Sequence, residues 1–197
     1  MKQVKGEFCA QIEVKKSKFI AHIFEAKQLA KRREELWQAH PKAAHIVWAT
    51  RHLNEFLQVV ENSSDDGEPK GSSGVSVLNA LRGGEFVDAA VAVVRYFGGV
   101  KLGVGGLVRA YSAAANEVIA RCVGEGGAVE FVPREEFRCF VPFALVAKVA
   151  HHFAKFEFDF SQNWGEGGAE FAMFLTQSQS AAAAEFLREF NLQLSKV

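Results

Sequence analysis

The chain has 197 residues, of which 49% are apolar, and its 23 acidic residues balance its 23 basic ones. This length and apolar share allow one large or two small globular domains, while a net charge of zero excludes a molecule that attracts nucleic acid over its whole surface. We find no signal-peptide pattern and no apolar run of about 18 residues, so we expect a cytoplasmic protein without a membrane partner.

Strands and helices are expected to alternate in the first half of the chain. Apolar residues alternate along 4–14, and 19–24 is predicted to return as the second strand of a hairpin across the basic turn at 15–18. The stretch 87–97 is nearly all apolar, which is typical of a central strand covered on both faces. The other predicted elements are a helix over 27–39 that Pro41 ends, strands over 44–50 and 56–60, a loop over 62–74, a short helix over 75–81 and a helix over 105–122.

Glycines at 124, 126 and 127 mark a linker, so we predict a domain of residues 1–127 and a second domain of residues 128–197. The first contains 17 Lys and Arg against 14 Asp and Glu, the second 6 against 9, so the first is the one expected to meet phosphate. The second reads βαββαβ, the ferredoxin-like order, which makes the fold class α+β with two domains. Its predicted elements are strands over 136–141, 156–160, 171–175 and 192–197, helices over 143–153 and 178–190, and a turn over 163–168.

A glycine-rich turn follows the buried strand at 87–97 and leads into a helix. Glycine lets a ligand approach the backbone, and a helix N-terminus offers free N–H groups and the positive end of its dipole, so the turn is expected to bind phosphate. A Walker A motif is absent, and Val108 occupies the place of the third glycine of a dinucleotide fingerprint. A tight turn with a purely architectural role remains an alternative. The predicted phosphate-binding or nucleic-acid-binding residues are Arg95, Lys101, Gly103, Gly105, Gly106 and Arg109.

An acidic loop lies about thirty residues before this turn. Asp65, Asp66 and Glu68 bring three carboxylates together, and Lys70 follows them. We interpret these four residues as a polar recognition loop. A Mg²⁺ site and a solvated turn whose Asp side chains cap backbone N–H groups are the alternatives.

Cysteines and histidines give no catalytic or metal-binding pattern. Cys9, Cys122 and Cys139 are far apart, so we expect reduced, buried thiols rather than a disulfide or zinc framework. The six histidines fall at no ligand spacing, and no nucleophile can be matched with a base. The sequence therefore predicts no catalytic residue, no metal and no cofactor.

Two separated motifs resemble the signature of the YigZ/IMPACT family. They are SDDGEP at 64–69 and VRYFGG at 94–99, the second continued by LGVGGLV at 102–108 and the pair AY at 110–111. The segment KKSKFI at 15–20 and the stretch from His40 to His45 are also similar to the family pattern. The match covers most of residues 1–122, and the βαββαβ tail resembles the smaller second domain of the bacterial members.

The resemblance implies a fold and a role. The first domain is expected to adopt the fold of the second domain of small-subunit ribosomal protein five, also seen in domain IV of elongation factor G, and the tail that of domain V. Eukaryotic relatives regulate translation by competing for an activator of a stress kinase. For bacterial members the resemblance implies binding to nucleic acid or the ribosome. Family members often have Thr where this chain has Val104, so backbone N–H groups of Gly105, Gly106 and Leu107 would have to contact the phosphate.

Three hypotheses about function follow. The first is a non-catalytic module that binds RNA or the ribosome, linked to the regulation of translation, in which the acidic loop shapes the pocket or meets a protein partner. The second is a Mg²⁺-dependent enzyme that handles phosphate with the glycine-rich turn and the acidic loop. The third is a protein-interaction module whose glycines are only architectural.

Overall fold

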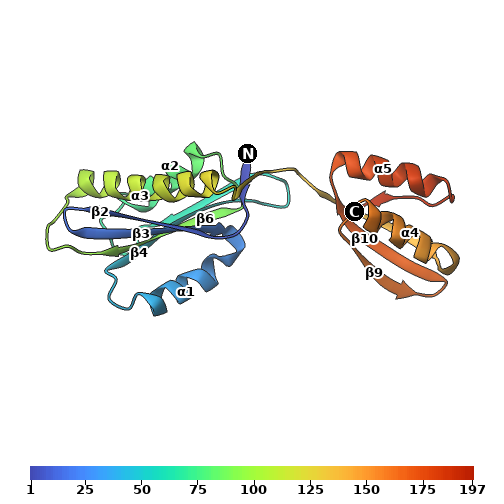
Figure 1. Cartoon of the computed structure of the whole chain (residues 1–197), viewed down its shortest axis with the longest axis horizontal. Helices are drawn as coiled ribbons and strands as arrows, with labels where there is room; N and C mark the ends of the chain where they lie inside the picture. The colour runs from blue at the N-terminus through green and yellow to red at the C-terminus, as the bar shows by residue number, and fades with distance from the viewer. The chain divides into compact units, whose positions relative to one another are not determined.

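The computed structural model describes residues 1–197, which form two units, Met1–Phe131 and Val132–Val197. We call them the N-terminal and the C-terminal unit. Each combines an antiparallel sheet with helices, as Figure 1 shows, which confirms the predicted α+β class and two-part layout.

A five-stranded antiparallel sheet of order β2-β3-β6-β4-β5 organises the N-terminal unit. Its central strand is buried along all of its length except Tyr96, as its apolar sequence predicts. Helices α2 and α3 cover one face and α1 the other (Figure 1). The elements are β2 (Phe8–Val14), β3 (Ser17–Glu25), η1 (Ala26–Gln28), α1 (Leu29–Ala39), β4 (His45–Leu53), β5 (Val59–Ser64), α2 (Gly74–Gly83), β6 (Ala89–Tyr96) and α3 (Val104–Gly124).

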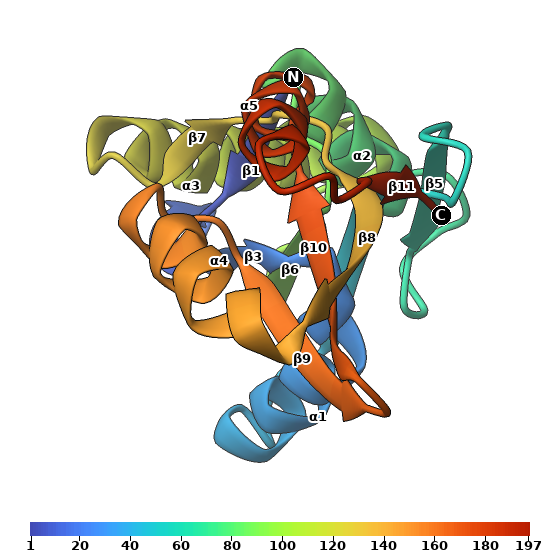
Figure 2. The same ribbon diagram turned by 90° about the vertical axis from the view of Figure 1, so that its right-hand side faces the viewer.

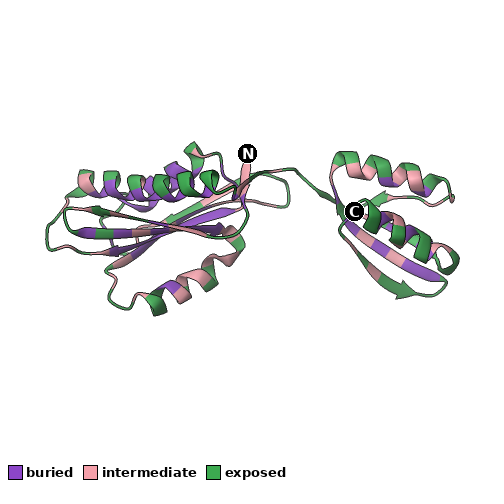
Figure 3. Cartoon of the chain, viewed as in Figure 1, coloured by how far each residue is buried: buried purple, intermediate pink, exposed green.

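Successive side chains of β6 point to opposite faces of the sheet and pack into two separate hydrophobic cores. Val91 and Val93 pack with α2 and α3, whereas Ala92 and Val94 pack against Leu36 of α1. Figure 3 shows this burial along the strands and on the helix sides that face them. No helix of the structure combines the length and the apolar character needed to cross a membrane.

A close backbone contact brings the β2–β3 turn against the segment that follows β6. Lys15 and Lys16 adopt positive φ angles of 47° and 64°, as a two-residue hairpin turn requires. A Cβ on Gly98 would lie 2.0 Å from the carbonyl carbon of Lys16, and the Gly98 N–H donates to Ser17 Oγ at 3.1 Å. Only glycine fits there, so the basic turn and the start of the glycine-rich segment are held together.

The C-terminal unit has the predicted order βαββαβ, with its four strands arranged β11-β8-β10-β9 (Figure 2). Both helices pack on one face, because Val149 of α4 and Leu187 of α5 share a core with Val141 and Phe171 of the sheet. The elements are β8 (Glu135–Pro142), α4 (Phe143–Lys155), β9 (Phe160–Gly165), β10 (Gly168–Leu175), α5 (Gln177–Arg188) and β11 (Ser195–Lys196), the last shorter than the predicted 192–197.

The boundary between the units lies after Phe131, rather than after residue 127 as the sequence suggests. Gly6, with a φ of +93°, breaks the predicted strand at 4–14. The piece before it, β1 (Lys2–Val4), pairs with β7 (Ala128–Glu130) instead of joining the large sheet. The residues just after the glycine linker therefore belong to the N-terminal unit.

The loop predicted over 62–74 begins too early, because residues 62–64 belong to strand β5. The strand runs from Val59 to Ser64, later than the predicted 56–60, because Leu57 has a φ of +56° and lies in the turn. Asn62 and Ser63 are polar because β5 is an edge strand, where exposed side chains are tolerated.

The alternating phenylalanines at 156–160 do not form the predicted strand. The N–H groups of Phe156 and Phe158 donate to the carbonyls of His152 and Phe153, and Glu157 has a φ of +56°. These residues therefore end helix α4. Strand β9 begins only at Phe160 and includes residues 163–165, which were predicted as a turn.

Gly98→Ala is expected to destabilise the N-terminal unit by about 3 kcal/mol or more, because the new methyl group meets backbone atoms that cannot rotate away. Urea titrations that follow amide NMR signals of β6 measure the effect. Gly83→Ala is the control, since its Cβ meets nothing within 4 Å and helix propensity changes stability by no more than about 1 kcal/mol. Equal stability of the two variants would contradict the close contact.

Candidate functional site

A pocket of about 490 Å³ opens where β6 ends and α3 begins. Its walls are mostly apolar, with a few polar groups that converge on it, which is the usual composition of a ligand site. The apolar side chains are those of Ala44, Pro69, Phe97, Leu102, Val104 and Leu107, and the polar ones those of His45, Glu68, Arg95 and Lys101.

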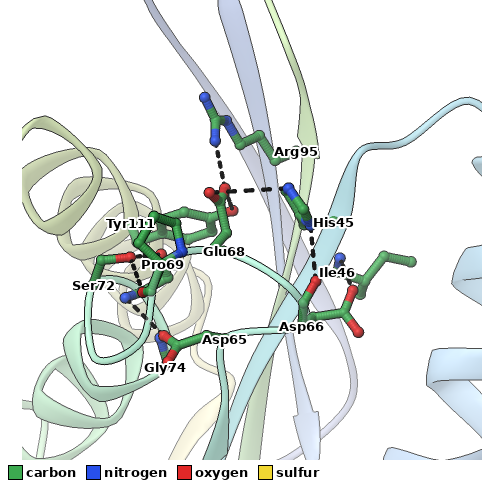
Figure 4. A network of polar contacts seen from close by, with 11 residues as sticks. His45, Ile46, Asp65, Asp66, Glu68, Pro69, Ser72, Gly74, Arg95 and Tyr111 are labelled. Carbon is green, nitrogen blue, oxygen red and sulfur yellow. Dashed lines mark hydrogen bonds and ion pairs between the residues drawn. The ribbon is translucent and has the colours of Figure 1, made fainter. Parts of the chain in front are cut away.

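A buried ion pair forms the polar side of the pocket (Figure 4). The side chains of Glu68 and Arg95 are 3% and 7% exposed, and Arg95 Nη1 donates to Glu68 Oε1 at 2.5 Å. The Tyr111 hydroxyl, from α3, donates to the same oxygen at 2.8 Å. A buried charge is costly unless it is paired and hydrogen-bonded, so these three residues depend on one another.

Aromatic rings surround the rest of the Arg95 guanidinium. Its central carbon lies 5.7 Å from the ring centroids of both Phe19 and Phe97, within the range of cation–π attraction. Its Nε is buried and has no hydrogen-bond partner. Burial, followed by the negative charge of Glu68, raises the pKa of Tyr111 far above its ordinary value, so its hydroxyl stays a donor at neutral pH. Arg95, predicted from the sequence to hold phosphate, already has Glu68 as its partner.

His45 lies next to the second oxygen of this carboxylate (Figure 4). Its Nδ1 is 2.8 Å from the backbone carbonyl oxygen of Asp66, and a carbonyl can only accept, so Nδ1 carries the hydrogen. The other ring nitrogen, Nε2, is 4.0 Å from Glu68 Oε2. Because His45 pairs with Arg95 across β4 and β6, the register of the sheet brings it to the site.

The acidic loop uses its aspartates to hold its own backbone. Asp65 accepts hydrogen bonds from the N–H groups of Gly71, Ser73 and Gly74 at 2.7, 3.0 and 2.8 Å, at the start of α2. Asp66 Oδ2 accepts from the Ile46 N–H at 2.7 Å. These contacts match the alternative in which Asp side chains cap backbone N–H groups. Nowhere in the 197 residues do three or more His, Cys, Asp or Glu side chains gather as metal ligands would.

The predicted turn at the start of α3 is present. Gly103 has a φ of +71°, and its carbonyl accepts from the Leu107 N–H at 2.9 Å, so the helix begins at Val104. The N–H groups of its first turn have no intrahelical partner, and no side chain caps them. Gly103, Val104 and Gly105 are exposed. This end of α3 therefore presents free donors beside the pocket.

Three exposed cations surround that helix end. Lys101 lines the pocket, while Lys15 and Arg109 line a second hollow of about 360 Å³ together with Gly106. Leu102 borders both hollows. None of the three cations has an ion-pair partner, because Glu68, the only acidic residue lining either hollow, is buried against Arg95.

The structure thus brings together part of the predicted site. Lys101, Gly103, Gly105, Gly106 and Arg109 lie at one end of the N-terminal unit, whereas Lys70 is exposed on its loop and lines neither hollow. Sequence reasoning did not assign Lys15, His45 or Tyr111 to the site, although all three lie in segments that resemble the family signature. Tyr111 occupies an ordinary apolar position of the predicted helix. Lys15 and His45 reach the site through the pairing of strands, which the neighbouring residues in the sequence do not indicate.

A larger pocket of about 810 Å³ lies elsewhere in the N-terminal unit and is lined in part by Trp48, His52 and Asp88. The Asp88 carboxylate already accepts from the side-chain amide of Gln3 and the Leu53 N–H. The carboxylate in this larger pocket is therefore already occupied, and the pocket includes none of the predicted site residues. We take the smaller pocket as the candidate site.

A cysteine next to a histidine occurs on the β2–β3 hairpin, although the sequence suggests no such pair. Cys9 Sγ lies 3.8 Å from His22 Nε2, and His22 Nδ1 lies 3.3 Å from Glu7 Oε1, because strand register places Cys9 opposite His22. Burial raises the pKa of the Cys9 thiol, against the opposing effect of Arg121. An activated cysteine nucleophile needs a lowered pKa, so we assign no catalytic role to Cys9.

Comparisons with known proteins agree with the motifs. A family model described as the Impact N-terminal domain matches residues 15–119. A *Haemophilus influenzae* IMPACT family member is 38% identical over 110 residues, which cover 54% of this chain and 53% of that protein. IMPACT family member YvyE of *Bacillus subtilis* is 27% identical over 187 residues, 91% of this chain and 81% of the relative.

Further matches extend the likeness. IMPACT family member YigZ of *Escherichia coli* is 37% identical over 112 residues, which cover 54% of each chain. The matched segment thus spans about half of the *Haemophilus* and *Escherichia* relatives. A crystal structure described as that of an hypothetical protein has a TM-score of 0.79 at 23% identity, over 100% of this chain and 96% of the other, which shows a shared fold.

Asp65→Ala is expected to lower the free energy of unfolding at pH 7 by about 1–2 kcal/mol, as for other lost helix caps. Burial raises the pKa of the Asp65 carboxyl, but hydrogen bonds from Gly74, Gly71 and Ser73 outweigh it and leave the pKa below its ordinary value. The stabilisation is therefore complete above the unfolded-state pKa of about 3.9 and is lost as pH falls through the folded-state value. Urea titrations from pH 7 downward measure the difference between wild type and variant, with Glu55→Ala as an exposed control. If the difference in unfolding free energy between wild type and Asp65→Ala grew as the pH fell, the role of the Asp65 carboxylate as a cap would be contradicted.

Arg95→Met is expected to cost about 3–5 kcal/mol, because it leaves the Glu68 carboxylate buried without its cation. The double variant Arg95→Met with Glu68→Leu removes both charges and should recover a large part of that loss. Unfolding of the single and double variants in urea tests this coupling. A single variant that loses less than about 1 kcal/mol would show that the pair is not essential to the fold.

Proposed function

This chain belongs to the IMPACT family, and we propose that its N-terminal unit is a non-catalytic module that binds the phosphate backbone of RNA, free or within the ribosome, where α3 begins. A cytoplasmic location and a link to the regulation of translation, which the family resemblance implies, are part of the same proposal. Two of the relatives are matched over only about half of their length, so the role is argued from this chain's own residues.

One observation carries the proposal: Lys15, Lys101 and Arg109 are exposed, have no ion-pair partner, and surround the uncapped N-terminus of α3. Free backbone N–H groups and the helix dipole favour anions at the same place. The molecule as a whole is neutral, so this local excess of positive charge is a property of one end of the N-terminal unit.

The spread of the three cations favours a chain of phosphates over a single one. Lys101 lies on one hollow and Lys15 with Arg109 on the other, with Leu102 between them. Contacts to successive phosphates position a nucleic acid strand without reading its sequence. Arg95 takes no direct part in this interaction, because its charge is compensated by Glu68.

Neutralising the cations should reduce both the affinity for RNA and its dependence on salt. Single-stranded RNA held by three phosphate contacts is expected to give a slope of log affinity against log salt of about −2, at about −0.7 for each contact. Lys15→Gln, Lys101→Gln and Arg109→Gln should each remove about 0.7 from that slope. Fluorescence anisotropy with a labelled single-stranded RNA at several salt concentrations measures it.

Lys5→Gln is the matched control, because Lys5 is exposed and without an ion pair but lies beside Gly127, past the far end of the 21-residue helix α3. That distance is about 30 Å along the helix axis. A flat salt response, or an equal effect of Lys5→Gln and Lys101→Gln, would contradict the proposal and favour the protein-interaction hypothesis.

A further inference from the structure

Two hydrogen-bond acceptors face each other in the pocket with no donor between them. Glu68 Oε2 is 4.0 Å from His45 Nε2, and neither atom receives a hydrogen bond from the protein. The donors of Arg95 and Tyr111 both go to the other carboxylate oxygen, Oε1. Because Nδ1 faces the Asp66 carbonyl, the tautomer with its hydrogen on Nδ1 fits the contact and presents a lone pair at Nε2.

Both atoms border the pocket and are accessible to solvent, so a ligand that displaces water there has to supply donors in its place. The side chain of Glu68 is only 3% exposed, and its polar neighbours are fixed by the sheet and by α3. An amino group placed between the two acceptors could donate one hydrogen to each.

The rest of the pocket suits a flat, apolar ring. Phe97 is 53% exposed at the rim, and Leu102, Val104 and Leu107 supply apolar surface. The volume of about 490 Å³ lies within the range of about 300–1,000 Å³ that is usual for ligand pockets. Aromatic side chains that stack on bases are the common means of binding single-stranded nucleic acid.

We propose that this pocket accepts one unpaired nucleobase with an exocyclic amino group, which donates to Glu68 Oε2 and His45 Nε2 while the ring packs against Phe97. Adenine, cytosine and guanine carry such a group. Uracil has none: its N3–H can donate to only one of the two acceptors, and the carbonyl oxygens beside it would face the other. The pocket therefore discriminates against uracil, because at least one of its acceptors loses water without gaining a donor.

The inference rests on the proposed RNA binding for the source of the base. Lys101 and the start of α3 line the same pocket, so a phosphate held there would present its own base to the opening. The phosphate contacts give affinity for any sequence, and the pocket adds a preference at one nucleotide.

Nucleotide titrations followed by NMR signals of His45, Phe97 and Tyr111 test the pocket directly. Adenosine monophosphate and purine riboside monophosphate have the same ring system and phosphate and differ only in the amino group. We expect the probe without the amino group, and uridine monophosphate, to bind roughly tenfold more weakly, because one or both acceptors stay unpaired. Equal affinity of the three nucleotides, or no shifts at these residues, would overturn the inference.

A variant at the rim tests the stacking while it leaves both charges of the buried ion pair in place. Phe97→Ala is expected to weaken adenosine monophosphate binding roughly tenfold. Phe56→Ala is the matched control, since Phe56 is 73% exposed and does not line the pocket. Equal binding by the two variants, with unchanged circular dichroism, would contradict the role of Phe97.

The inference and the RNA-binding proposal fail in different ways. Oligo(U) that binds as well as oligo(A), with a steep salt slope that Lys101→Gln reduces, would overturn the base pocket and leave phosphate binding standing. Selective binding of adenosine monophosphate together with a flat salt response to RNA would support the pocket and overturn the backbone proposal.

Discussion

The buried ion pair of Glu68 and Arg95 is the contact on which the candidate site depends. Glu68 comes from the loop before α2, Arg95 from β6, and Tyr111, which donates to the same carboxylate oxygen, from α3. One carboxylate thus joins three elements that are distant in sequence. Because each charge alone would be costly in the interior, the loop, the strand and the helix hold one relative arrangement.

This pairing also determines the electrostatics of the surface around it. Glu68 is the only acidic residue that lines the hollows at the start of α3, and its charge is compensated inside the protein. Asp65 and Asp66 are bonded to backbone N–H groups. The exposed charged residues that line the hollows at the start of α3 are positive, so a neutral molecule acquires a local site for anions. The same pairing occupies only one oxygen of Glu68 and leaves the other facing the pocket.

Local patterns predicted those features of the fold that depend on local chemistry. The apolar run of β6, the glycine-rich turn after it and the start of α3 are properties of contiguous residues, and the sequence indicated all three. Such patterns gave a wrong prediction where the same spacing of apolar residues is compatible with both a strand and the end of a helix. Phenylalanines at 156 and 158 alternate as in a strand, yet the residue between them takes a positive φ and ends a helix.

By itself, the amino-acid sequence determined the α+β class, the two-part layout, the family and the glycine-rich turn with its cations. Only the tertiary structure decided which charges are free. Arg95 and Lys101 look equivalent in the sequence, but Glu68 lies 27 residues from Arg95 and reaches it only through the fold. Likewise, Gly98 meets Ser17 across 81 residues and brings Lys15 to the site. Long-range packing determines which charged side chains pair with each other, and the residues next to them in the sequence do not reveal these partners.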